Sequence, residues 1–221
     1  MVIREKYRPS ASWLAAFLLI WLCITGCAGI SPYQPRNHRE EGPERGIFTG
    51  SKGEFVIALP AEELQKLRGD LLVLENMSVN ANRERLLLVQ GNCLEIQLDL
   101  ICEAGVGGLK VCCAPDDSEY TLISYDVDTH EIALDTQHAS LSPDAVQERH
   151  TYTLADADNK PRKLHIFIDR SVIEVFTEDG QCLTARIYPT SPDSDGIKVF
   201  ADNGTLRIPK IQLWRMDSIW D

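Results

Sequence analysis

Residues 164–190 read LHIFIDRSVIEVFTEDGQCLTARIYPT, and in this stretch apolar side chains recur at every second position. Leu164, Ile166 and Ile168 lie at alternate positions between Lys163, His165 and Asp169, which is the two-residue period of a strand with one buried face. A second strand is expected over 171–177 and a third over 183–188, because the turn signal EDG at 178–180 separates them. The stretch therefore predicts neighbouring antiparallel strands.

The same period continues on both sides of this stretch. Further strands are expected over residues 71–79, 85–90, 94–100, 109–113, 120–125, 130–134, 196–201 and 211–216. Many short strands at turn spacing, with no long helix, predict an all-β fold, a two-sheet antiparallel β-sandwich. One short helix is expected over 60–68, because Pro60 suits its first position, Glu62 and Glu63 its positive end, and Gly69 its stop.

The N-terminal region predicts export. Arg4, Lys6 and Arg8 precede the uninterrupted apolar run WLAAFLLIWLCI at 13–24, which is the layout of a signal peptide. The sequence ITGC at 24–27 resembles a bacterial lipobox, which implies a lipid on Cys27; an uncleaved membrane anchor and an ordinary cleaved signal are the alternatives.

These features divide the chain into three parts. We expect a signal peptide or lipoprotein anchor over 1–27, a flexible tether rich in Pro and Gly over 28–53, and the sandwich with its lead-in helix over 54–221. Each of these readings puts the sandwich outside the cytoplasm, as an envelope lipoprotein, a membrane-anchored domain or a secreted one, because the basic end stays inside.

Charge and cysteine content exclude several classes of function. Lys and Arg number 22 against 33 Asp and Glu, so the formal net charge is -11, which argues against nucleic-acid binding. Apart from Cys23 and Cys27, five cysteines are present, without the spacing of a zinc site. One or two disulfides among them are left open, and no cofactor or metal is expected.

Three segments carry a more specific signal: DRSVIEVF at 169–176, RIYPT at 186–190 and IQLWRMDSIW at 211–220. With LPAEELQKLRG at 59–69 and NCLEIQLDL at 92–100, they resemble the C-terminal β-sandwich module of glycoside hydrolase family 32, the invertases, levanases and inulinases. The resemblance implies structural roles for Asp169, Arg170, Ser171, Glu174, Phe176, Arg186, Tyr188 and Trp214. Thr136 departs from the family pattern, which usually has an arginine there.

The motifs that would carry catalysis in that family are missing from this sequence. The resemblance implies a nucleophile in a WMNDPNG-like motif, an Asp in an RDP motif and an acid/base Glu in an EC motif, and none of the three occurs. A five-bladed catalytic propeller needs on the order of 200 residues, far more than the segment 28–53 offers. We therefore expect no catalytic residues in this chain.

Asp169 and Glu174 form the most tempting pair of carboxylates. A retaining glycosidase needs two carboxyl groups roughly 5 to 5.5 Å apart. Five residues apart in an unbroken strand, the two side chains would lie on opposite faces, whereas a turn at 170–171 would let them approach. We expect packing rather than chemistry, with Glu174 half-buried and Arg186 as its partner. Trp214 and Trp220 are expected in the core rather than in a sugar-stacking platform.

Two functions are consistent with these observations. The first is an exported, non-catalytic module that acts as a scaffold or binds a fructan, another carbohydrate or a protein partner weakly. Such a module should expose an apolar patch unless a partner, a second copy or the tether covers it. The second is a fragment of a split or truncated β-fructosidase, active on sucrose or fructans only with a separate propeller.

Overall fold

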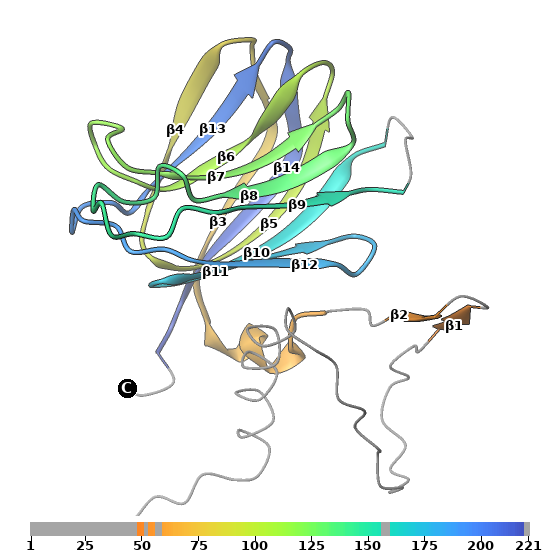
Figure 1. Cartoon of the computed structure of the whole chain (residues 1–221), viewed down its shortest axis with the longest axis horizontal. Helices are drawn as coiled ribbons and strands as arrows, with labels where there is room; N and C mark the ends of the chain where they lie inside the picture. The colour runs from red at the N-terminus through yellow and green to blue at the C-terminus, as the bar shows by residue number, and fades with distance from the viewer. Residues whose placement is uncertain (1–47, 51–52, 56–58, 156–159, 219–221) are drawn as a thin grey trace, which may run out of the picture. The chain divides into compact units, whose positions relative to one another are not determined.

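The computed structural model describes residues 48–50, 53–55, 59–155 and 160–218, and it confirms the expected fold class. Two six-stranded antiparallel sheets pack face to face (Figure 1). The first, here called the β10 sheet, has the order β12 (Cys182–Arg186), β11 (Val172–Thr177), β10 (Arg162–Asp169), β5 (Cys93–Cys102), β14 (Leu206–Met216) and β3 (Arg68–Val79).

The second sheet is called the β6 sheet. Its order is β4 (Arg83–Gln90), β13 (Gly196–Asp202), β6 (Val106–Cys113), β7 (Thr121–Asp126), β8 (Glu131–Asp135) and β9 (Arg149–Thr153). Strands β3 and β4 therefore end the two sheets on one side of the sandwich, and β12 and β9 end them on the other. The last strand in the sequence, β14, pairs with both β3 and β5.

Alternation along the strands builds the core as predicted. In β5, the residues Leu94, Ile96 and Leu100 are fully buried and face the other sheet, together with the inward rows of β6, β7 and β10. Outward residues of the same strands keep polar or mixed character. The two-residue period thus separates a core layer from two outer faces, and the outer faces carry the candidate sites.

The structure differs from the sequence prediction in three elements. Strand β9 was not predicted; four of its five residues are polar, and only Tyr152 packs against the core. The expected helix over 60–68 is a shorter 3-10 helix, Glu62–Leu67, because strand β3 already begins at Arg68. Two short paired strands, β1 (Phe48–Gly50) and β2 (Gly53–Phe55), occupy the end of the expected tether and the first residues of the expected sandwich segment.

The expected export segment, including Cys27, lies outside the described residues. Within the described ranges, no helix is long and apolar enough to cross a membrane. The five cysteines of these ranges are free thiols, so none of the disulfides left open by the sequence is formed there.

Candidate functional site

The DRSVIEVF motif forms the hairpin of β10 and β11. Arg170 and Ser171 make a two-residue turn. In this turn Arg170 has a positive φ of 52°, and its backbone N–H donates a hydrogen bond to Asn92 O at 2.6 Å. Asp169 lies opposite Val172 in the register, and Glu174 follows two positions later on the same face. The turn therefore brings Asp169 and Glu174 to one outer face of the β10 sheet.

Glu174 is half-buried on this face and electrostatically coupled to Asp169. Burial raises the pKa of the Glu174 carboxyl, and the neighbouring Asp169 charge raises it further. The predicted partner is wrong: Arg186 lies opposite Val172 and is exposed, and no ion pair joins it to Glu174 in the described part of the chain. The pair thus consists of two carboxyl groups without a compensating cation from the neighbouring strand.

A second, fully buried carboxylate occupies the centre of the same face. Glu95 of β5 lies between Phe167 of β10 and Trp214 of β14 in the register, with none of its surface exposed. Arg68 donates two hydrogen bonds to it, one from Nε at 2.8 Å, and His165 Nε2 lies 2.6 Å from Oε1. This network was missed from the sequence, where Glu95 is simply one polar residue of an alternating strand.

The contacts of Glu95 decide its protonation. Burial alone raises the pKa of its carboxyl, but the hydrogen bonds from Arg68 and His165 outweigh burial and lower the pKa to about 2. Glu95 is therefore ionised at neutral pH, and it cannot serve as a general acid.

Large side chains close the rest of this face. The Arg68 guanidinium lies 4.1 Å above the Trp214 ring, and the rings of Phe167 and Phe176 meet edge to face at 6.1 Å. Trp214 is 8% exposed and Phe176 7%, so neither offers an open ring to a sugar. Tyr188, also in the family motifs, is exposed; Trp220 lies outside the described residues.

Glu119 is also fully buried, and it joins two loops. Its oxygens accept hydrogen bonds from the backbone N–H groups of Leu141 (2.8 Å), Thr190 (2.7 Å) and Ser191 (3.0 Å), and from the Ser194 hydroxyl (2.9 Å). Burial raises the pKa of the carboxyl, but these donors outweigh it and lower the pKa to about 2. Thr190, the last residue of the RIYPT motif, is therefore held in place by Glu119.

Thr136, the departure from the family pattern, also has a structural role. It is buried after β8, its hydroxyl donates to Glu148 O at 3.1 Å and accepts from Glu148 N at 2.9 Å. A threonine in this place closes the loop that leads to β9.

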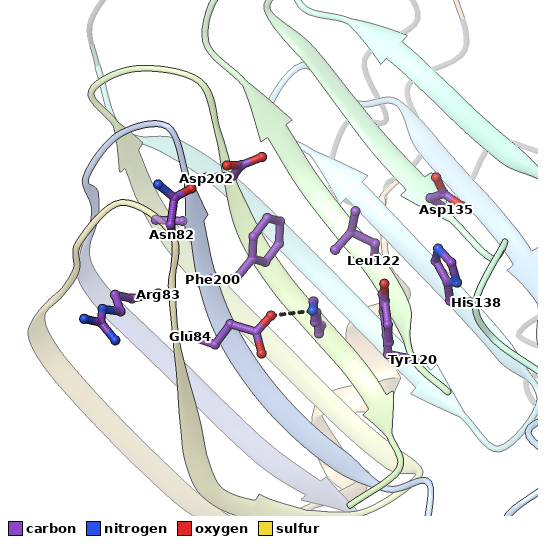
Figure 2. A pocket seen from close by; sticks show the side chains of 11 residues that line it. Asn82, Arg83, Glu84, Tyr120, Leu122, Asp135, His138, Phe200 and Asp202 are labelled. Carbon is purple, nitrogen blue, oxygen red and sulfur yellow. Dashed lines mark hydrogen bonds and ion pairs between the residues drawn. The ribbon is translucent and has the colours of Figure 1, made fainter. Parts of the chain in front are cut away.

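The outer face of the β6 sheet is hollowed. A depression of about 420 Å³ lies over β13, β6 and β7, and we call it the β6 hollow. Figure 2 shows Asn82, Glu84 and Asp202 on its β4–β13 side and Tyr120, Asp135 and His138 on its β7–β8 side.

Apolar and charged groups are combined in the β6 hollow. Leu122 and Phe200 supply apolar surface between the two sides (Figure 2). Lys110 is ion-paired to Glu84, and its Nζ lies 4.3 Å from the centre of the Tyr120 ring. Nothing in the sequence pointed to this site, because its residues come from five different strands and from the turns beside them.

The described residues do not gather into a metal site, since no three His, Cys, Asp or Glu side chains among them could share an ion. Asp169 and Glu174 do not line the β6 hollow. The geometry therefore provides a packed motif face on one side of the sandwich and an open, mixed-polarity hollow on the other.

Comparison with known proteins agrees with the architecture. The family model described as "Glycosyl hydrolases family 32 C terminal" matches residues 63–215. The levanase of Bacillus subtilis (strain 168) is 25% identical over 177 residues, which cover 77% of this chain and 26% of the levanase. The extracellular exo-inulinase of Aspergillus awamori is 32% identical over 108 residues, 47% of this chain and 20% of the inulinase.

Solved structures show the same fold. The crystal structure of Aspergillus awamori exo-inulinase superposes with a TM-score of 0.65 at 21% identity, over 79% of this chain and 35% of that one. Fructan 1-exohydrolase IIa from Cichorium intybus gives a TM-score of 0.65 at 17% identity, over 78% and 40%. The chain spans less than half the length of each of these relatives. The match over most of its sandwich shows that the chain belongs to the glycosyl hydrolase family 32 C-terminal family.

Proposed function

We propose that this chain is a non-catalytic β-sandwich module related to the β-fructosidases, exported and held at the membrane by its N-terminal segment. In this role it supports or binds a partner and does not cleave a glycosidic bond. The basic residues, the apolar run at 13–24 and Cys27 support export and anchoring. The proposed partners are a fructan or other carbohydrate, a separate catalytic propeller, or a second copy.

The state of the carboxylates is the observation that carries the proposal. Hydrolysis with retention needs one carboxyl group with a raised pKa as acid and a second as nucleophile, with a sugar between them. Glu95 and Glu119 are fully buried, hydrogen-bonded and ionised, with pKa values of about 2, so both are committed to structure.

Asp169 and Glu174 meet the electrostatic requirement only in part. Burial raises the pKa of Glu174, and Asp169 is near, as in an acid and nucleophile pair. Their surroundings, however, are the pleated surface of the sheet: Phe167 lies opposite Glu174 on β10, and Thr184 opposite it on β12. A sugar ring needs a depression between the two carboxyl groups, and neither of them lines the β6 hollow.

A second candidate function is a fragment that works only with a separate propeller-bearing chain. The observation that favours it is the apolar character of the β3–β4 side of the sandwich. Leu71 and Val73 on β3 and Leu86 and Leu88 on β4 are exposed, Leu88 to 96%. Exposed leucines on sheet edges are typical of surfaces that a partner covers.

The test is release of fructose by the purified full chain in detergent, incubated with sucrose, inulin and levan and followed by chromatography. We expect no release above the buffer control. Release that is abolished by Asp169→Asn or Glu174→Gln, and not by the matched exposed substitution Asp128→Asn, would overturn the proposal.

The fragment alternative has its own readout. A chain with WMNDPNG-like and RDP motifs, encoded beside this one, should then co-purify with it and release fructose only when both are present. This alternative would be excluded if the two chains purified separately and if mixing them did not change the rate of fructose release.

A further inference from the structure

The β6 hollow has the size of a small-molecule site. Its volume of about 420 Å³ lies within the roughly 300–1,000 Å³ of ligand pockets. Its lining combines two kinds of surface, because polar side chains lie on both sides of the apolar residues Leu122 and Phe200 (Figure 2). Such a combination suits a ligand with both hydroxyl groups and C–H surface.

The polar groups of the hollow fall into two sets. Asp202 and Asn82 are exposed on one side, and Asp202 forms no ion pair with any of the described residues. On the other side are the Tyr120 phenol and the exposed His138 imidazole. Carboxylate, carboxamide, phenol and imidazole together offer both donors and acceptors, as neighbouring sugar hydroxyls require.

The aromatic side of the hollow is preorganised. The rings of Tyr120 and His138 stack with centroids 5.0 Å apart and 26° between their planes, and Tyr120 N donates to His138 O at 2.8 Å. Lys110 also packs on the Tyr120 ring, with its Nζ 4.3 Å from the ring centre. A wall that is already ordered loses little conformational entropy when a ligand binds.

The charges of the hollow are mixed and largely compensated. Lys110 pairs with Glu84, which also lies 3.6 Å from Lys198 Nζ, and Asp135 lies 3.7 Å from Arg149 Nε. The two remaining charged residues of the lining, Arg83 and Asp202, have opposite signs. No uncompensated cluster of one sign remains that would select a phosphate or a metal ion. The chemistry therefore favours a neutral ligand.

We propose that the β6 hollow binds the end of a neutral oligosaccharide of the fructan type, with Asp202 and Asn82 receiving hydroxyl groups on one side and Tyr120 and His138 contacting the sugar on the other. Only the choice of fructan rests on the proposed function; the hollow and its neutral character rest on geometry. The site lies on the face opposite to the family-motif hairpin and uses none of its residues.

The experiment is isothermal titration calorimetry of the full chain in detergent with nystose, a neutral fructan tetrasaccharide, and with maltotetraose for comparison. We expect saturable nystose binding with a Kd of about 0.1–1 mM, as fits a shallow site with few contacts. Asp202→Ala and His138→Ala should each weaken binding at least tenfold, because each removes a hydrogen-bonding group from one side of the site.

Matched controls keep the outcome interpretable. Asp202 is exposed, so Asp202→Ala should leave the thermal midpoint unchanged, whereas His138→Ala should lower it only slightly through loss of the ring stack with Tyr120. Asp128→Ala, exposed and outside the hollow, should bind as the parent does. Absence of nystose binding, affinity unchanged in both variants, or binding of maltotetraose alone would overturn the inference. Chromatography of the same samples reports fructose release separately, so cleavage would contradict the proposed function without deciding whether the hollow binds.

Discussion

Glu95 and Glu119 are buried charges whose hydrogen bonds hold distant parts of the chain together. Glu95 joins β3, β5 and β10, and Glu119 joins the loops after β8 and β12. A buried carboxylate is costly unless its oxygens are fully hydrogen-bonded, and both side chains meet that condition. The negative charges of Glu95 and Glu119 therefore stabilise the packing of the fold.

We predict that Glu119→Gln lowers the free energy of unfolding by about 2–3 kcal/mol at pH 7. All four groups around the carboxylate donate hydrogen bonds to it. The amide nitrogen of glutamine is itself a donor, so it would face a donor and could not accept the hydrogen bond that the carboxylate oxygen accepts. Urea denaturation measures the change, and Glu75→Gln, at an exposed position of β3, is the control. Equal stability of the two variants would contradict the structural role.

The pH dependence follows from the same two carboxylates. Their pKa values are about 2 in the folded chain, below the ordinary value of 4.5, so their stabilisation is complete above about pH 4.5. As the pH falls from about 4.5 to about 2, the unfolded chain binds these protons first and stability is lost. Glu119→Gln should show a shallower loss in this window, because one of the two groups no longer titrates.

Part of the candidate site could be predicted at this scale and part could not. The sequence placed Asp169 and Glu174 on neighbouring strands and allowed for the turn that brings them together. It could not supply the surroundings of Glu95, which depend on Phe167 and Trp214, residues that are distant in the sequence and meet only through strand order. The Glu174–Arg186 prediction was wrong, because register puts Arg186 opposite Val172 instead.

The β10–β11 hairpin shows how one turn sets the contents of a whole face. Arg170 adopts a φ of 52°, a conformation that costs an ordinary side chain roughly 1 kcal/mol and that glycine adopts freely. The turn fixes Asp169 opposite Val172 and thereby puts 169, 174 and 176 into outward rows.

We predict that Arg170→Gly raises the free energy of unfolding by about 0.5–1 kcal/mol, because it relieves the left-handed residue and keeps the N–H that bonds to Asn92. The neighbouring Ser171, whose φ is not positive, is the matched control, and Ser171→Gly should lower stability. Thermal unfolding of both variants provides the comparison. Destabilisation by Arg170→Gly would mean that the arginine side chain has contacts beyond the turn.

At the element scale, hydrophobic alternation was enough to predict most strands. The inward rows of β5 and β10 are buried and, apart from Arg162 at the start of β10, apolar, so their period is visible in the sequence. Strand β9 escaped because an edge strand has one paired neighbour and needs little apolar surface. Its assignment depends on pairing with β8, which local sequence does not encode.

The two sheets of the whole molecule end on the same side in β3 and β4, where large apolar side chains are exposed. Leu88 is 96% exposed on β4, which among the described strands pairs only with β13. An unpaired strand edge with exposed leucines favours association with another chain. The sequence predicted an apolar patch but not its place, because strand order decides which strands become edges.

We predict that Leu88→Lys reduces concentration-dependent self-association while leaving the free energy of unfolding within about 0.5 kcal/mol of the parent. Sedimentation velocity over a range of concentrations measures association. Thr151→Lys, an exposed change on the opposite edge strand β9, adds the same charge and should leave association unchanged. Equal association of the parent and both variants would show that the β3–β4 side is not an interface.

A crystal structure of the chain soaked with 1-kestose tests the absence of catalysis most directly. We predict that the trisaccharide stays intact, with sugar density confined to the β6 hollow beside Asp202 and His138. A fructosyl group bonded to Asp169 or Glu174, or a cut sugar lying between strands of the β10 sheet, would contradict it.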